Sequence, residues 1–113
     1  MKLIVAIVRV FKVTELVDAV EQLGDFPGMT VLECRGFGRE KGQPHELPQE
    51  DLEDFVERRC VVVAVPEDQV GRVVQRIADV AHTGQPGDGK LFVLPLDDAM
   101  RIATAERGDA ALR

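Results

Sequence analysis

The sequence predicts an α+β fold in which helices cover one face of a four-stranded antiparallel sheet. Three observations predict it: short runs rich in Val and Ile, two stretches with apolar residues at helical spacing, and the order in which they alternate. The 113 residues suit a single domain, 1–113, and 45% of them are hydrophobic, which is enough for a buried core.

The first part of the chain is predicted to form a strand, a helix and a second strand. Residues 2–11 are rich in Val and Ile and favour a buried strand. Thr14 is a good N-cap for the helix that follows, and Gly24 is a plausible C-cap. The apolar residues of this helix are Leu16, Val20 and Leu23. Residues 29–37 alternate loosely and predict the second strand.

The second part of the chain is predicted to follow the same order. Residues 59–65 contain a continuous apolar run, which predicts a third strand. Pro66 is expected to begin a helix, because proline is favoured at the first helical position. The buried stripe of that helix consists of Val70, Val73, Val74, Ile77 and Ala81. Residues 91–96 predict the last strand, and the tail from residue 97 is polar and weakly patterned.

The order strand, helix, strand, strand, helix, strand is ferredoxin-like, with both helices on one face of the sheet. Apolar residues on both faces of the strands leave one face uncovered, so we expect copies of the chain to pack there. Residues 38–54, between the second and third strands, contain Gly42, Pro44, Pro48 and many charges, with no apolar periodicity. A loop of this length in a compact domain is usually functional or disordered.

The composition argues against several classes of protein. The net charge of −6 argues against nucleic-acid binding, which needs clustered Lys and Arg. No run reaches the ~18 apolar residues of a membrane span, and the apolar N-terminus lacks a cleavage site, so we expect a cytoplasmic protein. Cys34 and Cys60 do not have the spacing of metal ligands and are expected to be reduced residues in or near the core.

The segment that points most directly to a function is residues 83–90, Thr-Gly-Gln-Pro-Gly-Asp-Gly-Lys. Its three glycines allow positive φ angles and a close approach of backbone N–H groups to a ligand. Successive N–H groups in such a turn bind anions, and Lys90 adds a positive charge, so the segment suits a di- or triphosphate. It lacks the spacing of a Walker A loop. On composition alone, a plain turn from helix to strand is an equally good interpretation.

Separated motifs in the sequence resemble the P-II family of signal-transduction proteins. Residues 27–31, Pro-Gly-Met-Thr-Val, and 35–42, Arg-Gly-Phe-Gly-Arg-Glu-Lys-Gly, resemble that family's second strand and the entry to its T-loop. Residues 83–92, which contain Gly-Asp-Gly-Lys, look like its B-loop. Phe11-Lys12 near the beginning and residues 101–108 near the end also fit, so the similarity covers nearly the whole chain.

The resemblance implies a homotrimer that binds an adenine nucleotide (ADP, ATP or AMP) in each cleft between neighbouring subunits. The T-loop corresponds to about residues 38–55, the B-loop to about 83–90 and the C-terminal loop to about 97–113. The residues that the resemblance puts at the nucleotide are Thr30, Gly38, Arg39, Val62, Ala64, Gly87, Asp88, Gly89, Lys90 and Arg101. Arg101 would come from the adjacent chain. Taken alone, Arg101 could be a surface arginine, and Val62 and Ala64 would be core residues in any case.

The chain departs from the family's pattern at several of these positions. Ala103 stands where the family has a second C-terminal arginine, so we expect ATP to lose more affinity than ADP or AMP. Glu40 replaces a glutamine that helps to hold Mg²⁺ and 2-oxoglutarate; a carboxylate can ligate Mg²⁺ but repels a keto-acid dianion. Arg58 replaces a lysine at that site. We therefore expect weakened 2-oxoglutarate sensing.

The modification sites known in the family are also absent. The chain has neither Tyr nor Ser, which excludes tyrosine uridylylation and serine phosphorylation. Leu47, Leu52 and Phe55 in the acidic T-loop are candidates for docking on a target protein, a transporter or an enzyme, that offers a basic surface. A solvated loop without a partner is the alternative. His45 and His82 support neither a catalytic role nor a metal site.

The expected function is regulation rather than catalysis, because no nucleophile–base pair accompanies Asp88 and Glu40. An adenine nucleotide would shift the population of T-loop conformations and so control a target protein, with no cofactor required beyond Mg²⁺ that could accompany the nucleotide. The alternative is a P-II-like sensor specialised for bicarbonate or metal transport, which binds ADP or AMP rather than ATP with 2-oxoglutarate. A purely structural trimer is a third interpretation, but it would not need residues 87–90.

Overall fold

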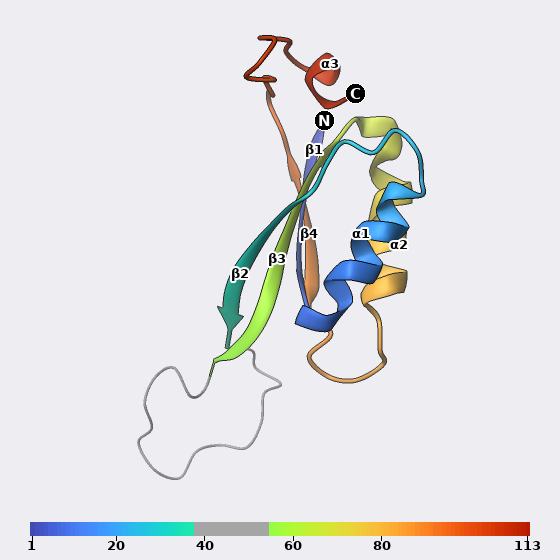
Figure 1. Cartoon of the computed structure of the whole chain (residues 1–113), viewed down its shortest axis with the longest axis vertical. Helices are drawn as coiled ribbons and strands as arrows, with labels where there is room; N and C mark the ends of the chain where they lie inside the picture. Colours follow the sequence, from blue (N-terminus) through green and yellow to red (C-terminus); the bar gives the residue numbers. More distant parts are fainter. Residues whose placement is uncertain (38–54) are drawn as a thin grey trace.

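The computed structural model describes residues 1–37 and 55–113, and its elements follow the predicted order (Figure 1). The strands are β1 (Lys2–Val8), β2 (Thr30–Gly36), β3 (Val56–Val65) and β4 (Lys90–Pro95). The helices are α1 (Val13–Glu21), α2 (Val70–Ala81) and the short α3 (Asp109–Leu112). Two 3-10 turns, η1 (Val10–Lys12) and η3 (Glu67–Gln69), precede α1 and α2.

The strands form one antiparallel sheet in the order β2-β3-β1-β4. β1 is central: it pairs with β3 from Lys2 opposite Val65 to Val8 opposite Arg59, and with β4 on its other side. α1 and α2 pack against each other on one face of this sheet (Figure 1). The ferredoxin-like prediction is therefore confirmed.

The core lies between the sheet and the two helices. Alternate strand residues point into it, because successive side chains of a strand face opposite sides of the sheet. The buried strand residues are Ile4, Ala6, Val8, Val61, Val63 and Val65. The helices contribute Leu16, Val20, Val73, Ile77 and Ala81. The helical stripes predicted from the sequence supply all five of these helix residues.

The opposite face of the sheet, called here the open face, is apolar and has no helix over it. Val5 of β1 lies opposite both Val62 of β3 and Phe92 of β4, which makes one apolar row across the sheet. Leu3, Ala64 and Leu94 form the next row. Phe92 is 50% exposed and Leu94 is 42% exposed. Contiguous exposed apolar surface of this kind marks an interaction site.

The two cysteines also lie on the open face. Cys60 is opposite Leu32, and Cys34 is opposite Arg58, so the thiols are diagonal neighbours on β2 and β3. Both are free and half-buried. Burial, and then the neighbouring Cys60, raises the pKa of the Cys34 thiol above its ordinary value. Because the thiolate is the reactive form, Cys34 is a poor nucleophile at neutral pH.

The start of α1 differs from the prediction. Thr14 is not the N-cap, because η1 runs directly into the helix; Lys12 is the capping residue, with helical φ and ψ of −88° and −11° and no side-chain cap. The first strand accordingly ends at Val8 instead of residue 11. Its pairing with β4 already stops at Ile7, opposite Lys90.

Two further boundaries were also wrong. The C-cap of α1 is Gln22, and Gly24 instead closes the following turn with φ +77°. Pro66 is extended and precedes η3, so α2 begins only at Val70.

β3 begins at Val56, three residues before the predicted start at residue 59. The charged residues in this part of β3 interrupt the apolar pattern by which the strand was predicted. Their charges are complementary across the strand pair: Arg59 lies opposite Glu33, and Glu57 lies opposite Arg35. Two opposite charges that face each other across an antiparallel strand pair stabilise the pair by roughly 0.2–1 kcal/mol. In the part of the chain that the structure describes, no helix combines the length and apolar character needed to cross a membrane.

Candidate functional site

The B-loop lies where β1 ends and β4 begins. α2 ends at Ala81, and its C-cap residue His82 is extended, which leads the chain away from the helix and into the loop. The loop then returns to the sheet at Lys90, opposite Ile7 of β1. It occupies the end of the molecule opposite to α3 (Figure 1). Residues from α2, β1, β3 and β4 can therefore act together here.

The Asp88 carboxylate organises the B-loop from within. Its Oδ2 accepts hydrogen bonds from the backbone N–H groups of Thr83 at 2.7 Å and Gly84 at 3.0 Å. Its Oδ1 accepts from the Thr83 hydroxyl at 2.5 Å and from Arg9 Nε at 3.0 Å. The Thr83 hydroxyl in turn accepts from the N–H of Gln85 at 3.2 Å.

These hydrogen bonds hold the pKa of Asp88 well below its usual range. The hydrogen bond from the Thr83 hydroxyl lowers the pKa most, and the bond from the Thr83 N–H is next. Burial acts in the opposite direction and raises the pKa. The hydrogen bonds from Arg9 and Gly84 are smaller causes of the lowering. Hydrogen bonds to an ionised carboxylate favour the charged form. Asp88 is therefore a fixed anion at physiological pH, and its oxygens are directed at the loop itself.

Two arginines hold the outer turn of the B-loop from the sheet side. Arg9, which follows β1, donates from Nη2 to the Pro86 carbonyl at 2.9 Å. Arg58 of β3 donates from Nη2 to the Gly87 carbonyl at 3.1 Å and from Nη1 to the Glu57 carbonyl at 2.9 Å. Successive carbonyl groups of the loop are thus each bound by a guanidinium group.

The glycines of the loop are required by its conformation. Gly84, Gly87 and Gly89 have φ angles of +88°, +97° and +106°, which residues with a Cβ rarely adopt. A Cβ on Gly89 would lie 1.7 Å from the carbonyl oxygen of Ile7. A Cβ on Gly87 would lie 3.0 Å from Arg58 Nη2. The loop therefore needs glycine both for its φ angles and for its close approach to β1.

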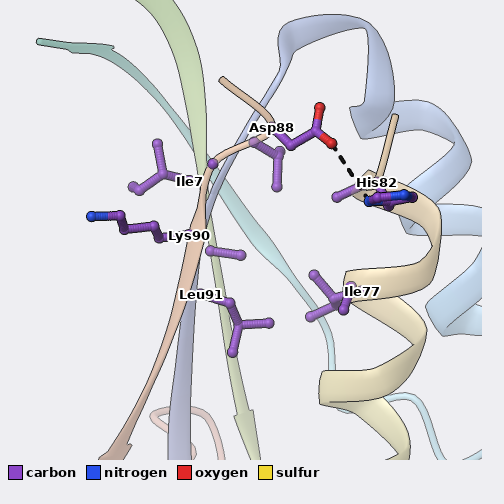
Figure 2. Close-up of a pocket in the computed structure, with 11 residues that line it drawn as sticks. Ile7, Ile77, His82, Asp88, Lys90 and Leu91 are labelled. Atoms are coloured by element: carbon purple, nitrogen blue, oxygen red, sulfur yellow. Dashed lines mark ion pairs between the residues drawn. The ribbon is translucent and has the colours of Figure 1, made fainter. Parts of the chain in front are cut away.

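A small cavity of about 220 Å³ lies beside the loop, between α2 and the sheet (Figure 2). Ile77, Leu91, His82 and Asp88 point toward it, whereas Lys90 points away from α2 (Figure 2). The imidazole Nδ1 of His82 lies 3.7 Å from Asp88 Oδ2. Ligand pockets usually measure about 300–1,000 Å³. This cavity of about 220 Å³ is therefore too small for a nucleotide.

Three of the other residues that were predicted to lie at the nucleotide, Thr30, Val62 and Ala64, are on the same side of the sheet as Lys90. Thr30, the first residue of β2, is opposite Val62 of β3, and Val62 is in the row of Val5 and Phe92. Lys90 precedes Phe92 by two positions, so both side chains belong to the open face. Ala64 lies one row further from the loop. One face thus carries Lys90, Thr30, Val62 and Ala64 together.

Arg101 is not brought to this site within one chain. Its guanidinium lies against α3 and the C-terminus, and α3 is at the other end of the sheet from the B-loop (Figure 1). Its guanidinium binds Glu106 Oε1 at 3.1 Å and the carbonyls of Ala111 and Arg113 at 3.3 and 3.0 Å. Arg101 therefore holds α3 in place in the single chain.

The remaining predicted residues belong mostly to the T-loop. Gly38, Arg39, Glu40, Leu47 and Leu52 lie outside the described residues. Phe55, directly before β3, packs its ring against that of Phe37, with centroids 5.4 Å apart. Among the described residues, no cluster of His, Cys, Asp and Glu could hold a metal ion.

Arg9 was missed by the sequence analysis. No local motif surrounds it, and its partners Pro86 and Asp88 are more than seventy positions away. The topology could have found it: in a ferredoxin-like sheet β1 and β4 are neighbours, so the residue after β1 must lie beside the loop that enters β4.

Comparisons with known proteins agree with this architecture. Residues 1–106 match the family model described as nitrogen regulatory protein P-II. The chain is 40% identical to the nitrogen regulatory protein P-II of Azospirillum brasilense over 99% of its own length and 100% of the relative's. It is 41% identical to nitrogen regulatory protein P-II 1 of Escherichia coli, with the same coverage. A crystal structure of Arabidopsis thaliana PII bound to citrate superposes with a TM-score of 0.81 at 34% identity, covering 99% of this chain and 89% of that one.

Proposed function

This chain belongs to the nitrogen regulatory protein P-II family, and we propose that it is a homotrimeric regulator that binds an adenine nucleotide between neighbouring subunits and controls a target protein through its T-loop. Proteins of this family are signalling regulators. The proposal of nucleotide binding and target control therefore starts from a role in regulation rather than catalysis.

The observation that carries the nucleotide proposal is the shape of the B-loop beside Lys90. Asp88, Arg9 and Arg58 hold the loop through hydrogen bonds within the chain. Among the described residues, the Lys90 ammonium group has no hydrogen bond or ion pair, and it lies on the open face next to the row of Thr30 and Val62. A preformed loop with a cation at its edge suits a phosphate group.

Two features support a site shared between subunits. The open face leaves Phe92 and Leu94 exposed, which favours coverage by further copies of the chain. Arg101 is bound to α3, which lies at the opposite end of the molecule from the B-loop, so only a neighbouring copy could bring Arg101 to the phosphates (Figure 1). In that role Arg101 would exchange Glu106 and the C-terminal carbonyls for phosphate oxygens.

The choice of ligands follows from three positions. Ala103 is exposed in the C-terminal segment and offers no charge to an outer phosphate, which favours ADP or AMP over ATP. Arg58 already donates to the carbonyls of Gly87 and Glu57, so it is less available to a second anion. Glu40 adds a negative charge that repels a keto-acid dianion. We therefore do not propose 2-oxoglutarate as a second ligand beside the nucleotide.

The T-loop is the proposed contact with the target, an enzyme or a transporter. Its ends are held together by the last pair of the β2–β3 ladder, Gly36 opposite Val56, and by the contact between the tilted rings of Phe37 and Phe55. Nothing in the described residues favours bicarbonate or metal transport over nitrogen regulation, and a metal cluster is absent from them. We therefore propose no second function.

Calorimetry with AMP, ADP and ATP tests the nucleotide proposal, each with and without Mg²⁺ and 2-oxoglutarate. Lys90→Gln should weaken ADP binding about tenfold or more, since a hydrogen bond to a charged group contributes about 1.5–3 kcal/mol. Lys2→Gln is the matched control, because Lys2 lies at the far end of the same sheet, opposite Pro95. Absence of nucleotide binding by the unmodified trimer would overturn the proposal.

Deletion of residues 43–54 tests the T-loop separately. The variant should lose its target but keep most of its ADP affinity, because the B-loop contacts come from Arg9, Arg58 and Asp88. A deletion variant that fails to fold would count against the assignment of these residues to a separate contact surface.

A further inference from the structure

The orientation of two peptide groups in the B-loop follows from the arginines that bind them. A peptide group is planar, and in its trans form the C=O and N–H bonds point in opposite directions. No described peptide bond is cis. The Pro86 carbonyl points toward Arg9 Nη2 at 2.9 Å, and the Gly87 carbonyl points toward Arg58 Nη2 at 3.1 Å. The N–H groups of the same two peptide units, those of Gly87 and Asp88, therefore point away from the arginines.

These two N–H groups have no acceptor within the described part of the chain. Gly87 and Asp88 are only partly buried, so a ligand can reach them. Adjacent N–H groups that point to the same side of a turn form an anion-binding concavity. The concavity exists here because both carbonyls are held on the opposite side.

We propose that Arg9 and Arg58 are positioning residues for the nucleotide: they turn the carbonyls of Pro86 and Gly87 inward and so present the N–H groups of Gly87 and Asp88 to the phosphates. This inference rests on the proposed nucleotide site. Neither arginine contacts the phosphate in this arrangement. Arg9 acts additionally through Asp88, whose carboxylate fixes the beginning of the loop at Thr83 and Gly84.

The hydrogen bonds of the arginines fit this role. Arg9 uses Nε for Asp88 and Nη2 for Pro86, while Arg58 uses Nη1 for Glu57 and Nη2 for Gly87. Both guanidinium groups also lie against Gly87: a Cβ there would be 3.0 Å from Arg58 Nη2 and 3.4 Å from Arg9 Nη2. The two arginines therefore occupy the space behind the loop and leave its front to the ligand.

A double-mutant cycle separates positioning from direct contact. ADP affinity is measured by calorimetry for Arg9→Gln, Asp88→Asn and the double variant. We expect Arg9→Gln to weaken binding about tenfold, and the double variant to bind no more than about threefold more weakly than Asp88→Asn alone, because coupled residues are not additive. Arg72 is on the exposed side of α2 and has no hydrogen bond or ion pair with another described residue, so Arg72→Gln removes the same charge and should have no effect. Arg58→Gln should also weaken ADP binding.

An Arg9→Gln affinity equal to that of Arg72→Gln would overturn the positioning role, and fully additive losses would overturn the part of it that acts through Asp88. Amide chemical shifts without nucleotide supply a second readout. In Arg9→Gln the signals of Gly87 and Asp88 should shift or broaden while those of α1 remain in place, and unchanged signals would overturn the inference. If the unmodified protein bound no nucleotide, the proposed function would fail, and the amide signals would still decide whether the arginines orient the loop.

Discussion

Gly89 touches the backbone of Ile7: a Cβ atom on Gly89 would lie 1.7 Å from the Ile7 carbonyl oxygen. β4 therefore enters the sheet in direct backbone contact with β1, and the B-loop can close only because residue 89 lacks a side chain. The conformation of the B-loop and the pairing of β4 with β1 therefore depend on each other.

Gly89→Ala should disrupt both the loop and this pairing. Overpacking costs about 1–3 kcal/mol of the free energy of unfolding, and the φ of +106° adds strain. We expect a lower midpoint of thermal unfolding and loss of ADP binding. Gly71→Ala is the control: nothing lies within 4 Å of its Cβ position, and alanine in a helix should stabilise the protein by roughly 0.5–1 kcal/mol. Equal midpoints for the two variants would contradict the close contact.

Asp88 should make the loop resistant to mild acid. Its folded-state pKa is depressed, so its contribution to loop stability is fully present above the ordinary aspartate pKa of about 3.9. That contribution is lost only as the pH falls through the lower folded-state value. ADP affinity should therefore show no titration of Asp88 between pH 8 and pH 5. The measurement uses His82→Gln to remove the imidazole 3.7 Å away, and a transition in that range that Asp88→Asn abolishes would be the contrary result.

Ile77 should be a sensitive position of the core. It is 1% exposed and is part of the cluster between α2 and the sheet. Ile77→Ala should lower the free energy of unfolding by about 2–5 kcal/mol, and Ile77→Val by about 0.5–1.5 kcal/mol. Denaturant unfolding at one fixed protein concentration measures both. A loss below 1 kcal/mol for the alanine variant would mean that the helix can collapse onto the sheet.

Ala103→Arg should change the nucleotide preference. In the proposed site between subunits, an added guanidinium at this exposed position would face an outer phosphate of the nucleotide on the neighbouring copy. One charged hydrogen bond contributes about 1.5–3 kcal/mol, so the ratio of ATP to ADP affinity should rise about tenfold or more. Ala103→Gln controls for side-chain length without the charge. An unchanged ratio would place position 103 away from the phosphates.

The main elements were predictable because their signals are local. Leu16 and Val20 recur on one helical face, and the apolar run that contains Val61 and Val63 predicts a strand without any knowledge of its neighbours. The ends of the elements were less predictable. Thr14 has the chemistry of an N-cap, but η1 already supplies a helical turn before it, so the capping position falls on Lys12.

The site was predictable in part. The glycines and Lys90 are visible in sequence, and their spacing resembles a known loop. Arg9 was not visible, because its hydrogen-bond partners come from the other end of the chain. α3 was missed for a similar reason: it has only four residues, and the carbonyls at its end are bound by Arg101 from ten and twelve positions away.

In the proposed trimer, the open face of the sheet would make the stability of this protein a function of its concentration. Subunits that cover Phe92 and Leu94 in one another bind the folded chain and not the unfolded one, so mass action raises the midpoint of unfolding as the protein is concentrated. Dilution has the opposite effect and returns these side chains to water. A separated chain would expose this apolar surface, and heating near the unfolding midpoint should then lead it to aggregate rather than to persist as a folded monomer.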